Sequence, residues 1–449
     1  MSNALKGKVS TDITILGNSG SVDFEYDFNL FNNSAKEYNH DLCRLACQFV
    51  TVGYDDLTED ESAEAVSGFP WTQYGLKKVL DEAGFVHQEI QPKADRDEVS
   101  YFIASRDIEL ESGTFNLVVA AFIGSYKKTW FSNFDPYGVD RVCNDGKGYA
   151  GDEEKGIIHL GFADARDFVY GRIKAFLERN KSEYPIKILI TGHSRGAATA
   201  NLLGAKVLSM GGFGDGIDIA AENTYVYGFA TPNYANGKRV DLNDERFKQI
   251  YNIVSPEDFV TEVLPKALGF GKYGTIFSIF GQDNASLSDY AEEKEAMQAL
   301  YGKYKNDMVY APYKKGNKDV QKVAAVMAGS MTDLDVFYDK KMKECFNDYS
   351  SYEYYKYTLC GYVAGNDTPE DQENVNRAMK LMLGSAFDLI GTCKTYRKIS
   401  QFFVFKEGLG GATGNKIGKE YFNDAHRCET YLAYLMTMSE EQLRANTNK

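Results

Sequence analysis

The segment ILITGHSRGAATA, residues 188–200, constrains the fold of this chain more than any other stretch. An apolar run leads into a glycine-flanked serine, and small residues follow it. This pattern predicts a short buried strand, a sharp turn at Ser194 and a helix packed closely against the strand. Such a turn holds its serine in a strained conformation with the hydroxyl exposed, so Ser194 is a candidate nucleophile. A plain glycine-rich bend is the alternative interpretation.

Strand and helix patterns alternate on both sides of this segment. A hairpin is expected over 12–31, further strands at 99–110, 115–125, 185–192, 223–232 and 247–258, and helices after Ser34 and at 71–84, 161–180, 197–210 and 428–443. Strands that alternate with helices predict a largely parallel α/β sheet.

From residue 285 to residue 400 the chain has helical patterns and no strand of comparable quality. We interpret this segment as a helical insertion or cap on a single α/β core. The expected organisation is therefore a core over 1–284, the insertion over 285–400, and a return to the core over 401–449.

Composition and charge exclude several classes of function. The 449 residues are 43% hydrophobic and 25% charged, which is typical of a soluble globular protein, and no apolar run approaches the ~18 residues that span a bilayer. A net charge of -14 argues against nucleic acid and anionic membranes as main partners. The seven cysteines include no CxxC pair or His/Cys cluster, so neither a metal site nor a disulfide scaffold is indicated.

The N-terminal segment MSNALKGKVSTD has no apolar h-region and predicts no signal peptide in this chain. Localisation stays open between the cytoplasm and, had a leader been removed, the exterior. Oligomeric state is also left open.

A serine hydroxyl needs a base that accepts its proton, and the chain has five histidines. Surface or core placement is expected for His40 and His87, and packing or structural roles for His159 and His193. His426 lies just before the C-terminal helix, and α/β-hydrolases order their triad as serine, acid and a late histidine. We therefore predict His426 as the base, with a solvated surface histidine as the alternative.

The acid of such a triad should follow a strand after the nucleophile. The segment YNIVSPEDFVTEVLP places Glu257 and Asp258 at the end of a predicted strand. Asp258 is the first choice and Glu257 the second. A solvated acidic turn is the alternative for both residues.

Several pieces, taken in order, resemble the class 3 lipases, fungal triacylglycerol lipase-like α/β-hydrolases. They are FIGS (122–125) with Trp130, HLGF (159–162), TGHSRGAA, YGFATPN (227–233), EDFVTEVLP and AHRCETYL (425–432). These pieces cover about residues 100–280 and 420–433. The glycine-flanked serine is shared by many hydrolases, whereas the ordered set is much more specific.

The resemblance implies an oxyanion hole made by Ser125 and the backbone N–H of Arg195, and a lid over 126–152. Ile123 stands where the family usually has arginine, and Arg195 stands where it usually has leucine. Neither change removes a backbone donor. The acidic spacing in the expected lid fits no EF-hand, and the glycine-rich stretch 408–416 is interpreted as a flexible loop.

The sequence thus predicts a serine hydrolase of lipase/esterase type with an α/β-hydrolase fold. Carboxylic esters, with acylglycerols as candidates, are the expected substrates, and no cofactor is implied. Transient contact with a lipid surface is left open. The alternatives are a non-catalytic binding protein of the same fold, and a peptidase or thioesterase that uses the same triad.

Overall fold

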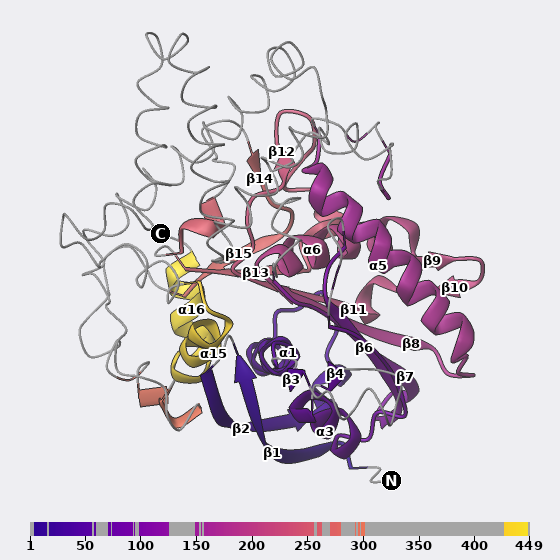
Figure 1. Cartoon of the computed structure of the whole chain (residues 1–449). Coiled ribbons are helices and arrows are strands. Elements are labelled where there is room, and N and C mark those ends of the chain that lie inside the picture. The colour runs from indigo at the N-terminus through magenta and orange to yellow at the C-terminus, as the bar shows by residue number, and fades with distance from the viewer. Residues whose placement is uncertain are drawn as a thin grey trace, which may run out of the picture.

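The computed structural model describes residues 4–15, 18–55, 58–59, 71–72, 74–92, 94, 98–124, 149–151, 154, 157–255, 258–262, 270–279, 292, 295–296, 298–300 and 426–447. A seven-stranded sheet runs through the centre of this part of the molecule, with helices on both of its faces (Figure 1).

The strand order in the central sheet is β15-β13-β11-β8-β7-β6-β5. The strands are β5 (His87–Gln91), β6 (Tyr101–Leu110), β7 (Gly113–Phe122), β8 (Ile186–His193), β11 (Thr224–Phe229), β13 (Ile250–Val254) and β15 (Thr275–Ser278). The five strands from β7 to β15 pair in parallel, and β5 and β6 form an antiparallel edge. The expected mostly parallel sheet is confirmed.

Helices lie on both sides of this sheet, and some of them pack on another helix or on the N-terminal hairpin rather than directly on the sheet. The helices are α1 (His40–Gly53), α3 (Tyr74–Glu82), α5 (Leu160–Arg179), α6 (Arg195–Met210), α15 (Cys428–Thr437) and α16 (Glu440–Thr447). Successive residues of β7 point to opposite faces, so Val118 and Ala120 pack in the core under α5 and α6, whereas Leu117 and Val119 pack in the core under α1. Burial on both faces explains why the parallel strands are nearly continuous apolar runs.

Short elements complete the described residues. They are the hairpin β1 (Lys6–Ile15) and β2 (Asn18–Asp27), the strand pairs β3 (Thr58–Glu59) with β4 (Trp71–Thr72), β9 (Gly212–Gly214) with β10 (Ile217–Asp218), and β12 (Ala235–Asn236) with β14 (Phe270–Gly271), and the 3-10 turns η1 (Phe28–Asn32), η5 (Ala221–Asn223), η6 (Glu245–Phe247) and η7 (Phe259–Glu262).

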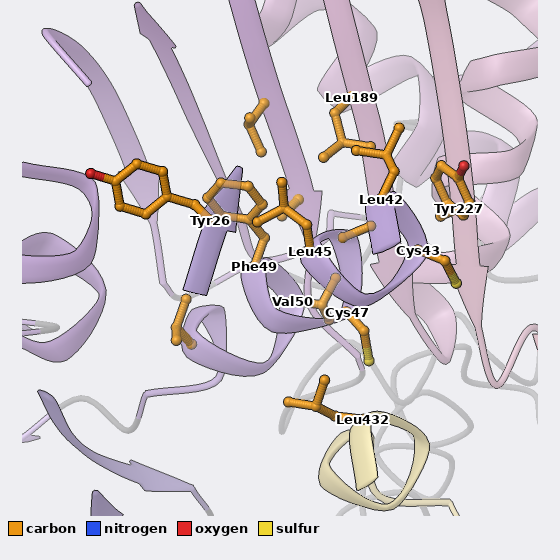
Figure 2. Close-up of a cluster of buried hydrophobic side chains, with 14 of the residues drawn as sticks. Tyr26, Leu42, Cys43, Leu45, Cys47, Phe49, Val50, Leu189, Tyr227 and Leu432 are labelled. Carbon is orange, nitrogen blue, oxygen red and sulfur yellow. The ribbon is translucent and has the colours of Figure 1, made fainter. Parts of the chain in front are cut away.

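Helix α1 lies between the sheet and the C-terminal helix α15 (Figure 2). Its side chains Leu42 and Phe49 are fully or almost fully buried, in one cluster with Leu189 of β8 and Leu432 of α15. Full burial of a leucine or phenylalanine side chain stabilises the fold by roughly 1.5–3 kcal/mol. Helix α1 therefore connects α15 to the central sheet, and this packing holds α15 against the core.

Several boundaries differ from those expected, and the single helix expected over 428–443 is two helices, α15 and α16, separated at Met438 and Ser439. Helix α1 begins at His40 because the Asn39 side chain, not that of Ser34, caps it by accepting the Leu42 N–H at 2.9 Å. The Ser34 hydroxyl instead accepts the Lys36 N–H within a preceding turn. The hairpin begins at Lys6 and ends at Asp27, so it starts earlier than predicted.

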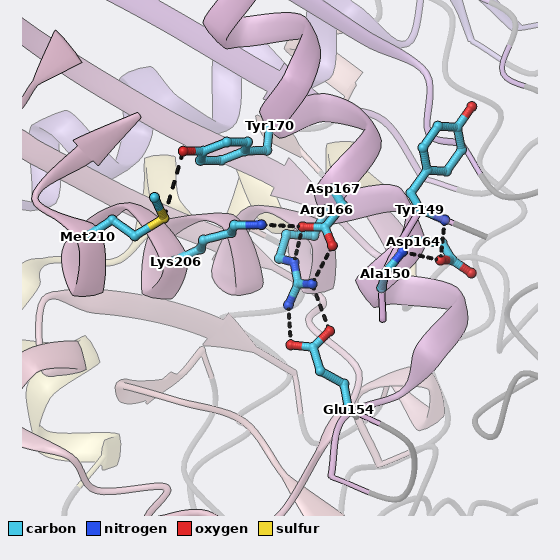
Figure 3. Close-up of polar contacts among 9 residues, drawn as sticks. All are labelled: Tyr149, Ala150, Glu154, Asp164, Arg166, Asp167, Tyr170, Lys206 and Met210. Carbon is cyan, nitrogen blue, oxygen red and sulfur yellow. Dashed lines mark hydrogen bonds and ion pairs between the residues drawn. The ribbon is translucent and has the colours of Figure 1, made fainter. Parts of the chain in front are cut away.

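The beginning of α5 is fastened to the segment that precedes it (Figure 3). One carboxylate oxygen of Asp164 accepts the backbone N–H groups of Tyr149 and Ala150, both at 2.8 Å. Arg166 forms a two-pronged ion pair with Glu154, with N–O distances of 2.8 and 2.7 Å. These contacts fasten Tyr149, Ala150 and Glu154 to the first two turns of α5.

Parallel strands flanked by helices, with a strand-to-helix turn after β8, form the α/β-hydrolase fold, and the predicted fold class is confirmed. The expected insertion over 285–400 lies outside the described residues, apart from a few positions before 301. No helix in the part of the chain that the structure describes is long and apolar enough to cross a membrane.

Candidate active site

Ser194 lies at the turn between β8 and α6, at the carboxyl edge of the sheet. Its backbone has φ 58° and ψ −125°, a conformation that costs a non-glycine residue about 1–3 kcal/mol. The surrounding backbone holds it there. The Ser194 N–H donates to the Phe229 carbonyl at 2.9 Å, and the Ser194 carbonyl accepts the Ala197 N–H at 2.9 Å. The expected strained elbow is present, but Ser194 is buried among the described residues and not exposed as expected.

The glycines on either side of Ser194 allow the helix to approach the sheet. A Cβ at Gly192 would lie 2.3 Å from the Gly196 carbonyl oxygen, and a Cβ at Gly196 would lie 2.2 Å from the Phe122 carbonyl oxygen. Both distances are shorter than a van der Waals contact. The two glycines of the pattern are therefore required by the close packing of α6 on the sheet.

His426 lies beside Ser194, immediately before α15. Its Nε2 is 2.8 Å from Ser194 Oγ, and its Nδ1 is 2.8 Å from Asp258 Oδ2. An ionised carboxylate can only accept hydrogen bonds, so Nδ1 carries the ring proton and donates a hydrogen bond to Asp258. Nε2 is then free to accept the proton of the Ser194 hydroxyl. The structure thus brings together the three residues that were selected from the sequence.

Asp258 is fully buried where the chain leaves β13. Its Oδ1 accepts the Val260 N–H at 3.0 Å, while Oδ2 accepts from His426 and from the Tyr431 hydroxyl, each at 2.8 Å. Lys272 supports this loop by donating to the Thr261 carbonyl at 3.0 Å. Three donors directed at one carboxylate stabilise its charge in a buried position. Glu257, the second choice, lies outside the described residues.

Tyr431 is a site residue that the sequence analysis missed. Its hydroxyl donates to Asp258 Oδ2 and accepts the Ser255 N–H at 3.0 Å. Burial and the neighbouring carboxylate raise the pKa of the Tyr431 phenol well above its usual value, so the hydroxyl keeps the proton that it donates. Tyr431 lies on α15, five residues after His426, and this spacing is the only trace of the contact in the sequence.

We expect Tyr431→Phe to lower kcat by about tenfold and to leave KM nearly unchanged. A hydrogen bond to a charged group contributes about 1.5–3 kcal/mol, and 1.4 kcal/mol corresponds to a tenfold change in rate. Steady-state kinetics with a soluble nitrophenyl ester would measure both constants. Tyr225→Phe is the matched control, because it removes a buried tyrosine hydroxyl that donates to the Asn33 carbonyl at 2.6 Å, away from the site. Equal kcat values in the two variants would contradict the prediction.

Of the two expected oxyanion donors, the structure describes Arg195 but not Ser125. The Arg195 N–H belongs to the first residue of α6, directly after Ser194. The Arg195 guanidinium is buried and donates to the carbonyls of Glu98 and Gly161, both at 3.0 Å. Ser125 lies outside the described residues, as does the expected lid over 126–152 except for Tyr149 to Gly151 at its end.

The remaining histidines lie in other settings. His40 is buried and contacts the Met438 carbonyl, His87 begins the edge strand β5, and His159 stacks on Phe162 at the start of α5. The side chain of His193 points to Tyr54, and its ring centroid lies 4.9 Å from that of His426. In the described part of the chain, no group of three or more His, Cys, Asp or Glu side chains is placed to hold a metal ion.

Part of the chain matches a known family. Residues 119–267 match the family model described as Lipase (class 3), and this segment includes the end of β7, the elbow at Ser194 and Asp258. The resemblance to the class 3 lipases is confirmed.

A relative from Saccharomyces cerevisiae, named "Putative lipase LIH1", is 31% identical over 178 residues. The alignment covers 35% of this chain and 50% of the yeast protein. The chain therefore spans about half the length of this curated relative.

Solved structures of fungal lipases are also similar to this chain. The mono- and diacylglycerol lipase from Aspergillus oryzae is 20% identical, with a TM-score of 0.33, and the alignment covers 57% of this chain and 84% of that one. Lipase II from Rhizopus niveus is 16% identical, with a TM-score of 0.34 and coverage of 54% and 80%.

Proposed function

We propose that this chain is a serine hydrolase of lipase/esterase type that cleaves carboxylic esters through an acyl-enzyme. The observation that carries the proposal is the continuous hydrogen-bond chain from Ser194 Oγ through His426 to Asp258, built on a strained elbow. Carboxylic esters, with acylglycerols as candidates, follow from the class 3 lipase resemblance together with this geometry.

In the acylation step, Ser194 Oγ attacks the ester carbonyl carbon while its proton passes to His426 Nε2. The bond to the alcohol oxygen then breaks, and His426 returns the proton to the leaving alcohol. Asp258 keeps Nδ1 protonated and stabilises the imidazolium that forms. In deacylation, water attacks the acyl-enzyme, again with His426 as the base, and the carboxylic acid leaves as Ser194 regains its proton.

The tetrahedral intermediate carries a negative charge on the former carbonyl oxygen. The Arg195 N–H at the N-terminus of α6 and the residue at position 125 are the donors that we propose for this charge. One such donor contributes about 10²–10³ in kcat. The helix N-terminus adds a favourable partial positive charge at the same place.

The first test is covalent labelling of the whole chain with a fluorophosphonate probe. An activated serine attacks phosphorus and expels fluoride, so we expect one adduct, on the peptide that contains Ser194. A binding protein of the same fold would stay unlabelled after prolonged exposure, and that result would contradict the proposal.

The second test identifies the leaving group and the acyl chain. A panel of nitrophenyl esters of increasing chain length is compared with a nitroanilide and a thioester of the same acyl group. We expect the oxygen esters to be turned over fastest. A preference for the anilide or for the thioester would replace the esterase proposal with a peptidase or a thioesterase that uses the same triad.

A further inference from the structure

Tyr54 follows the last residue of α1 and lies between the end of β7 and the nucleophile elbow. Its hydroxyl oxygen is 2.8 Å from the backbone nitrogen of Gly124 and 2.7 Å from Nδ1 of His193. Gly124 directly precedes position 125, and His193 directly precedes Ser194. A single hydroxyl group therefore contacts both the segment that follows β7 and the residue that precedes the nucleophile.

The proton on each atom of this cluster can be assigned. The Gly124 N–H can only donate, so the Tyr54 oxygen accepts it, and in the His193 tautomer with Nδ1 unprotonated the Tyr54 hydroxyl donates to Nδ1. Burial, together with the neighbouring His426, lowers the pKa of His193 well below its usual value, so its ring is neutral and Nδ1 can accept. Burial also raises the pKa of Tyr54, so the hydroxyl keeps its proton. Both hydrogen bonds are thus satisfied at once.

The packing around this hydroxyl leaves little room for movement. A Cβ at Gly124 would lie 2.1 Å from the Tyr54 hydroxyl oxygen and 3.2 Å from Ser194 Cβ. A Cβ at Gly53 would lie 2.6 Å from Ile123 Cδ1. The end of α1, the end of β7 and the elbow are therefore in direct contact, and the Tyr54 hydroxyl is the polar link among them.

We propose that Tyr54 is a positioning residue for the oxyanion side of the active site; this inference rests on the proposed function. Tyr54 holds the Gly124 backbone against Ser194 and, through His193, holds the elbow that carries Ser194 and the Arg195 N–H, one of the proposed oxyanion donors. An oxyanion donor is effective only within about 2.7–3.1 Å of the developing charge, so a small displacement of this backbone weakens transition-state stabilisation. Substrate binding in the ground state depends on it much less.

The experiment uses Tyr54→Phe, which keeps the ring and removes both hydrogen bonds. We expect kcat for a soluble nitrophenyl ester to fall by about 10- to 100-fold, part of the effect of losing one oxyanion donor, while KM changes less than about twofold. Ser194 Oγ adds to the carbonyl carbon of a trifluoromethyl ketone, and the adduct carries an oxyanion like that of the tetrahedral intermediate. The affinity of the variant for this inhibitor should therefore fall by the same factor as kcat. The matching methyl ketone, which stays trigonal, should bind the variant and the unmodified protein equally.

Tyr225→Phe is again the matched control, since it also removes a buried tyrosine hydroxyl, in this case on β11. We expect it to lower the melting temperature without changing kcat or the affinity for the trifluoromethyl ketone. Gly124→Ala tests the same contact from the other side, because its Cβ would displace the Tyr54 hydroxyl. It should show the same loss of kcat at a nearly constant KM.

The inference is wrong if Tyr54→Phe and Gly124→Ala lose only stability, as Tyr225→Phe does, and keep kcat and trifluoromethyl ketone affinity. Labelling of Ser194 in the unmodified protein would in that case leave the proposed function standing. If the unmodified protein neither reacts with the probe nor hydrolyses any ester, the proposed function is wrong, and this inference, which rests on it, is wrong as well.

Discussion

Replacing Ser194 with alanine is expected to lower kcat for ester hydrolysis by about 10⁶, because removal of a triad nucleophile leaves only oxyanion and binding effects. Alanine keeps the Cβ and can occupy the same elbow, so the fold should survive. The measurements are kcat on a nitrophenyl ester, labelling by the fluorophosphonate probe and the melting temperature. Labelling should disappear while the melting temperature stays close to that of the unmodified protein.

Ser105→Ala provides the matched control for this variant. Ser105 is buried in β6, and its hydroxyl has no hydrogen-bond partner among the described residues. The control should therefore keep full activity and full labelling. If Ser194→Ala retains more than a few per cent of the activity, the nucleophile is a different residue.

The parts of the site that could be predicted from sequence are those encoded by short stretches of chain. The elbow is local, because an apolar strand, two glycines and small helix residues all lie within residues 188–200. His426 and Asp258 were found through the order in which α/β-hydrolases place their triad residues. In the structure these two side chains form a hydrogen-bond chain to Ser194, which the sequence alone could not show. Ser125 and the helical insertion over 285–400 stay predictions, because Ser125 and most of that segment lie outside the described residues.

Contacts between distant segments explain what the sequence analysis missed. Tyr54 meets Gly124 and His193 across separations of 70 and 139 residues, and Tyr431 meets Asp258 across 173. The chain has 31 tyrosines, and nothing in the residues next to Tyr54 or Tyr431 distinguishes them from the others. Their roles appear only when α1 and α15 are packed against the sheet.

Replacing Asp258 with asparagine is expected to lower kcat by about 10⁴ near neutral pH. The buried carboxylate stabilises the imidazolium of His426, and the neutral amide does not. The amide NH₂ group also favours the wrong ring tautomer when it faces Nδ1. An asparagine accepts at one oxygen only, so the donors from Val260, Tyr431 and His426 cannot all be kept. One buried donor left without a partner costs about 1–3 kcal/mol, which a denaturant titration would detect.

Glu257→Gln is the matched control, since it changes the neighbouring carboxylate in the same way. It should alter kcat little if its side chain is solvated. If Glu257→Gln is the more damaging of the two changes, Asp258 is not the acid.

The double variant Ser194→Ala/Asp258→Asn tests whether these residues act as one unit. Asp258 and His426 serve only to activate Ser194, so once the nucleophile is gone the second change has nothing left to remove. The residual kcat of the double variant should therefore equal that of Ser194→Ala alone, although the two single effects of about 10⁶ and 10⁴ would multiply if they were independent. Residual rates on an activated nitrophenyl ester, measured at high protein concentration, make the comparison. A clear further loss in the double variant would mean that Asp258 contributes to catalysis by a route other than Ser194, and the triad assignment would then be wrong.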